Sequence, residues 1–92
     1  MDRKVNVMGV EDFKESGIIF YCTCDDIPSR NKSDLVAWFK DMKKIRLENE
    51  KEFEIIAIDP MMPQFTNKAV VLIKVDTNNI PTGVFPTVAT IK

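Results

Sequence analysis

The chain has 92 residues, of which 45% are hydrophobic and 29% charged, and its formal net charge is −1. This length suits a single domain (1–92) with a modest core, and the composition excludes an intrinsically disordered chain. The near-zero net charge excludes the overall basic field that draws a protein to nucleic acid or anionic lipid. No segment approaches the roughly 20 consecutive apolar residues of a membrane-spanning helix.

The start of the chain and the two cysteines indicate a cytoplasmic protein. Residues 3–8 form a strand-like segment, and no apolar signal-peptide core follows them. Cys22 and Cys24 lie two residues apart on a predicted strand, which places their side chains on one face at about 6.5–7 Å. Their Cα atoms are therefore at or beyond the usual limit for a disulfide. We expect reduced thiols and a location in the cytoplasm, the host cytoplasm if a phage encodes the chain.

The first half of the chain predicts two strands and one helix. Residues 3–8 alternate between apolar and polar side chains, and residues 18–24 are rich in β-branched and aromatic residues. The polar segment between them predicts a loop or one helical turn around Phe13. The helix begins near Asn31 or Ser33, with Asn31 as a capping residue, and runs to about Lys44. Its apolar positions recur at helical spacing at Leu35, Trp38 or Phe39, Met42 and Ile45.

The end of this helix is ambiguous, because residues 45–48 also alternate like a short strand. The second half predicts strands over 53–58, 69–75 and 84–91. Pro86 interrupts the last strand, which favours an edge position for it. The sequence therefore predicts an α+β domain of order β-β-α-β-β-β, with a mostly antiparallel sheet of four to five strands packed on one main helix.

The predicted central strands are apolar on both faces, and one helix can cover only one of them. The second face would carry six apolar side chains, namely Ile19, Tyr21, Ile56, Ile58, Val70 and Leu72. A half-exposed antiparallel sheet normally shows polar residues there. The sheet could curl into a small barrel, loops could fold over this face, or another chain could cover it. On this basis we expect a homodimer or a complex with another protein.

Two predicted loops, 60–65 and 80–86, are apolar and stiffened by proline. Such side chains are typical of recognition surfaces, although they could also pack back beneath the edge of the sheet. The residues that we expect to bind a partner are Met61, Met62, Phe65, Phe85, Ile19, Tyr21, Ile56 and Ile58.

The sequence predicts no catalytic residue, no metal ligand and no cofactor. It has no histidine, its three glycines match no phosphate-binding loop, and the two cysteines lack the second pair of a zinc site. Four aspartates lie near predicted strand ends, at Asp25, Asp26, Asp59 and Asp76. They could hold Mg²⁺ or Ca²⁺, but ordinary strand termination explains them as well.

We therefore expect a small non-enzymatic module that binds another protein, such as a phage- or mobile-element-encoded modulator or inhibitor of a host protein, for example of a defence system. A nucleic-acid or nucleotide binder is the alternative, and its basic residues would be Arg30, Lys32, Lys40, Lys43, Lys44 and Arg46. The glutamates that follow them would weaken that positive field. An enzyme with a carboxylate-bound metal is the third possibility.

Overall fold

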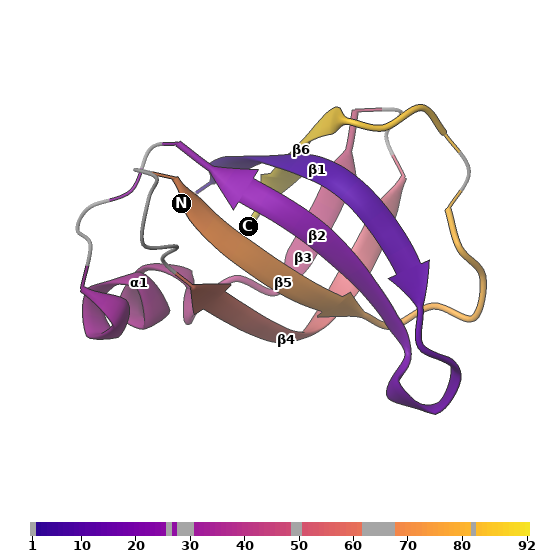
Figure 1. Ribbon diagram of the computed structural model, residues 1–92, viewed down its shortest axis with the longest axis horizontal. Helices are drawn as coiled ribbons and strands as arrows, with labels where there is room; N and C mark the ends of the chain where they lie inside the picture. The colour runs from indigo at the N-terminus through magenta and orange to yellow at the C-terminus, as the bar shows by residue number, and fades with distance from the viewer. Residues whose placement is uncertain (1, 26, 28–30, 49–50, 62–67, 82) are drawn as a thin grey trace.

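A computed structural model describes residues 2–25, 27, 31–48, 51–61, 68–81 and 83–92. Within these residues, six antiparallel strands close into a barrel in the order β1-β2-β5-β4-β3-β6 (Figure 1). The elements are β1 (Arg3–Asp12), a 3₁₀ turn η1 (Lys14–Ser16), β2 (Ile18–Cys24), α1 (Lys32–Phe39), β3 (Lys44–Leu47), β4 (Glu52–Met61), β5 (Ala69–Val75) and β6 (Thr87–Ile91). The predicted antiparallel α+β class with one main helix is confirmed, and the sheet takes the barrel form.

The interior of the barrel forms the core. Every second residue of β2 and β5 is buried, as expected for strands with one face turned inward. The ring of Phe20 lies edge-on to that of Phe53 from β4, with 5.6 Å between the ring centroids. The inward faces of the strands therefore pack mainly on one another, and the helix is not their main cover.

Helix α1 lies at one end of the barrel, beside the C-terminal end of β4 (Figure 1). Its predicted cap is confirmed, because the backbone N–H of Ser33 donates to Asn31 Oδ1 at 2.8 Å. The helix buries Leu35 and Phe39 in the core and ends at Phe39, so the prediction that it reaches Lys44 is wrong. Among the described residues, no helix is long and apolar enough to cross a membrane.

The segment after the helix is strand β3, which was the alternative interpretation of residues 45–48. Ile45 and Leu47 alternate inward, while the residues between and beside them face water. The backbones of Lys44 and Lys92 exchange two hydrogen bonds of 2.9 Å, which join β3 to the end of β6. Strand β3 therefore links β4 to β6 and completes the barrel.

Strand β6 does not lie at an edge, so that prediction is wrong. It pairs with β1 on one side and with β3 on the other. It begins at Thr87, immediately after Pro86, so the proline stays outside the paired region and removes no hydrogen bond from it.

A bulge between Ile55 and Ala57 reverses the alternation of side chains along β4. Beyond it, Ile58 pairs with the inward-facing Ile73 and packs against the core. Ile56 remains outside, with 56% of its surface exposed. The prediction that Ile56 and Ile58 share one face is therefore wrong. The strand also continues through Pro60, where the sequence predicts its end.

Candidate functional site

Strands β2 and β5 lie side by side in the barrel (Figure 1), and most of their outward side chains are apolar. We call this surface the outer β2–β5 face and define it by Ile19, Tyr21, Val70 and Leu72. Tyr21 lies directly opposite Leu72, and all four side chains are partly exposed. Closure of the barrel covers the other face of these strands and leaves this one toward water.

Polar and charged side chains surround the outer β2–β5 face. The hydroxyl of Tyr21 donates to Glu11 Oε2 at 2.9 Å, and this hydrogen bond raises the pKa of Tyr21. Lys74 is opposite Ile19 on one side, and Asp59 is opposite Leu72 on the other. Met61, 39% exposed, extends the apolar surface beside Val70. An apolar centre with a polar rim is the usual layout of a protein-binding surface.

A groove of about 180 Å³ runs between α1 and β4. Its lining residues are Val36, Phe39, Lys40, Met42, Ile55, Ile56, Ala57, Ile58 and Pro60. Val36 on the helix is 46% exposed, and Ile56 on the strand is 56% exposed. The predicted pair Ile56 and Ile58 therefore belongs to this groove and not to the outer β2–β5 face.

The two apolar loops have different outcomes. Phe85 is half-buried and packs against the core. Of the two possibilities for its loop, exposure for recognition or packing beneath the sheet, this residue follows the second. Its neighbour Val84 is 87% exposed and lines a second hollow of about 490 Å³ beside Glu48. Met62 and Phe65 lie outside the described residues, so their placement is not tested.

The predicted basic residues do not form one helical stripe. Lys32 and Lys40 lie at opposite ends of α1, whereas Lys43, Lys44 and Arg46 lie before or within β3. On the neighbouring strand, Glu54 is opposite Lys44 and Glu52 is opposite Arg46, which offsets the positive charge. Lys32 is 3.9 Å from Asp59. Arg30 lies outside the described residues.

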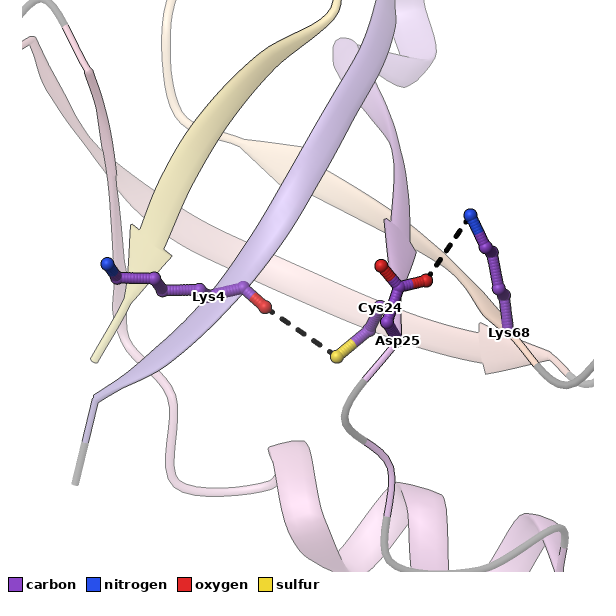
Figure 2. Close-up of polar contacts among 4 residues, drawn as sticks. All are labelled: Lys4, Cys24, Asp25 and Lys68. Carbon is purple, nitrogen blue, oxygen red and sulfur yellow. Dashed lines mark hydrogen bonds and ion pairs between the residues drawn. The ribbon is translucent and has the colours of Figure 1, made fainter.

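Both thiols point into the barrel and serve its core. Burial raises the pKa of Cys22 to about 12, so this thiol is protonated at neutral pH. The thiol of Cys24 donates to the carbonyl oxygen of Lys4 on β1, with 3.6 Å between sulfur and oxygen (Figure 2). Next to it, Asp25 is 3.4 Å from the ammonium of Lys68, at the start of β5. Neither thiol has the exposure that a nucleophile needs.

The strand-end carboxylates are dispersed. Asp25 and Asp59 each lie beside a lysine. In the part of the chain that the structure describes, no group of three or more potential ligands is placed to share a metal ion. Asp26 lies outside that part.

Sequence reasoning missed Val36 as a candidate binding residue. Leu35 and Phe39 are four residues apart and share the buried side of α1, and Val36 lies about 100° away around the helix. The sequence does contain a sign of this role, because Val36 is apolar although it lies outside the helical positions that face the core.

The comparisons give no relative from which a function could be transferred. No protein-family model matches the chain, and the searches of curated proteins and of solved structures give no significant match. The function is therefore argued from the surfaces described above.

Proposed function

We propose that this protein is a non-enzymatic binding module that docks another protein on the outer β2–β5 face. The observation that carries the proposal is the pairing of Tyr21 with Leu72, flanked by Ile19 and Val70, on the water-facing side of the barrel. An antiparallel sheet normally presents polar residues on such a face. Covering on the order of 200 Å² of apolar surface would contribute about 5 kcal/mol before the costs of association.

The proposed role is regulatory. A barrel domain without histidine that presents an apolar outer face suits a modulator or inhibitor of a host protein, for example one encoded by a phage or mobile element. A second copy of the chain is another occupant that the same face could accept.

The alternatives have less support. Nucleic-acid binding has less support because Glu52 and Glu54 lie opposite the two basic residues of β3 and offset their positive charge. A metal-dependent enzyme has less support because the carboxylates of Asp25 and Asp59 each lie beside a lysine. No specific observation favours either function over protein binding.

Affinity capture from host lysate tests the proposal when it is run with matched variants. Leu72→Lys places a charge in the centre of the outer β2–β5 face, and Val84→Lys places the same charge on the distant loop. We expect the wild-type protein and Val84→Lys to recover the same partner, and Leu72→Lys to recover at least about tenfold less. Equal recovery by Leu72→Lys, with an unchanged melting temperature, would refute the proposal.

A further inference from the structure

Strand β4 has an open edge beside the groove. On one side, residues 55–61 pair with β5. On the other side, β3 pairs only with residues 52–54, and the last contact is the hydrogen bond of 2.8 Å from Ile55 N–H to the Lys43 carbonyl. Among the described strands, none pairs with this edge beyond Ile55.

The backbone of Ile58 faces this open edge. The N–H of Asp76 donates to the Glu54 carbonyl, so alternate residues of β5 direct their backbone groups toward β4. On β4, Asp59 is paired with Leu72, one of these residues of β5, so the backbone groups of Asp59 face β5. Ile58 is the preceding residue, so its backbone N–H and C=O point to the opposite side, toward the open edge. Pro60 supports this assignment, because a proline is tolerated in a strand where its nitrogen faces an unpaired edge.

Helix α1 forms the opposite wall of the groove. The ion pair between Lys32 and Asp59 places the start of the helix beside the far end of β4. Lys40, at the other end of the helix, lines the groove together with Ile55 and Ile56. The helix therefore runs antiparallel to the strand, and the basic end of the groove lies where β3 closes the edge.

We propose that this groove binds the C-terminal tail of a partner protein as an added antiparallel strand. Ile58 N–H and C=O would bond to its backbone, and an apolar side chain would lie between Val36 and Ile56. A strand antiparallel to β4 runs toward Ile55, where Lys43 already occupies the edge, so pairing of the added strand must stop there and a chain terminus suits this position.

The charge at this end suits a terminal carboxylate. Lys40, Lys43 and Lys44 are exposed at this end of the groove and outnumber Asp41 and Glu54, which are also exposed. A carboxylate that ends the added strand would lie beside Lys40 and form a charge-assisted contact. The groove is separate from the outer β2–β5 face, so this inference does not depend on the function proposed above.

A titration followed by nuclear magnetic resonance tests this inference on the full chain. The probe is a pool of short peptides that have a free C-terminal carboxylate and are apolar at the last and third-last positions. We expect the amide signals of residues 56–59 and 36–40 to shift. The same pool with an amidated C-terminus should bind at least about fivefold more weakly, because it lacks the charge that Lys40 recognises. Alternate backbone N-methylation of the peptides should abolish binding.

Matched variants complete the test. Lys40→Glu should weaken binding of the carboxylate pool by about tenfold, whereas Lys4→Glu, an equal charge change on β1, should not. Leu72→Lys should bind the pool normally, which separates this site from the outer β2–β5 face. Absence of any shift, an equal response to the amidated or N-methylated pool, or shifts confined to β2 and β5 would overturn the inference.

Discussion

At the scale of single residues, the thiol of Cys22 makes the stability of the barrel depend on alkaline pH. In the folded protein its pKa is raised to about 12 by burial, compared with about 9 for an exposed thiol. Below pH 9 the thiol is protonated in both states, so stability does not change. Above pH 9 the unfolded chain loses this proton and the folded chain keeps it, so the free energy of unfolding falls as pH rises toward 12.

Denaturant unfolding at several pH values measures this effect. We expect the wild-type protein to lose up to about 1.4 kcal/mol per pH unit above pH 9, relative to Cys22→Ala. Val71→Ala, at the paired position on β5, is the control, since it also shortens a core side chain but keeps the thiol. The control should retain the wild-type slope, and an identical slope in Cys22→Ala would show that Cys22 is not the cause.

The alternation of single residues was predictable for β2 and β5 and not for β4. Residues 18–24 and 69–75 keep an unbroken period of two, so the sequence alone separates their two faces. In β4 the extra residue at the bulge shifts every later side chain to the other face. Phe53, Ile55, Ile56 and Ile58 are all apolar, and hydrophobicity alone does not indicate where the shift occurs.

At the scale of elements, the β4 bulge is tested by two substitutions of the same kind. Ile58→Asp places a carboxylate against the core and should lower the free energy of unfolding by about 3 kcal/mol or more. Ile56→Asp places it on the exposed side and should cost less than about 1 kcal/mol. Urea denaturation measures both, and similar losses for the two variants would contradict the bulge.

The boundary between α1 and β3 shows why an element can be mistaken from sequence. Leu35, Phe39 and Met42 have helical spacing, and Ile45 continues it by coincidence. Ile45 is buried through pairing with β4, the next strand, and with β6, which is distant in the chain. Local periodicity contains no information about such a partner, so it predicts a helix that is longer than the observed one.

At the scale of the whole molecule, closure depends on contacts between the two ends of the chain. Strand β6 pairs with β1 and β3, and these pairings convert an open sheet into a barrel. The sequence indicates most strands and suggests that one apolar face must be covered. It does not determine strand order, because pairing between remote segments depends on the packing of the complete core. The outer β2–β5 face was predictable from alternation, whereas the groove beside α1 was not.

The solution mass tests whether a second copy occupies the outer β2–β5 face. The chain has a mass of 10.5 kDa. We still predict a homodimer. The mass measured by light scattering should therefore approach twice that value as the protein concentration rises, and Leu72→Lys should remain monomeric. A monomer mass for the wild-type protein at every concentration would leave only a different protein as the occupant.

The most direct test of the binding face is a methyl-selective nuclear magnetic resonance titration with the captured partner. We expect the methyl signals of Ile19, Val70 and Leu72 to shift on binding, because these side chains become buried at the interface. The methyl signals of Val84 and Val88, which are exposed elsewhere, should not change. Shifts confined to Val84 and Val88, with the outer β2–β5 face unchanged, would contradict it.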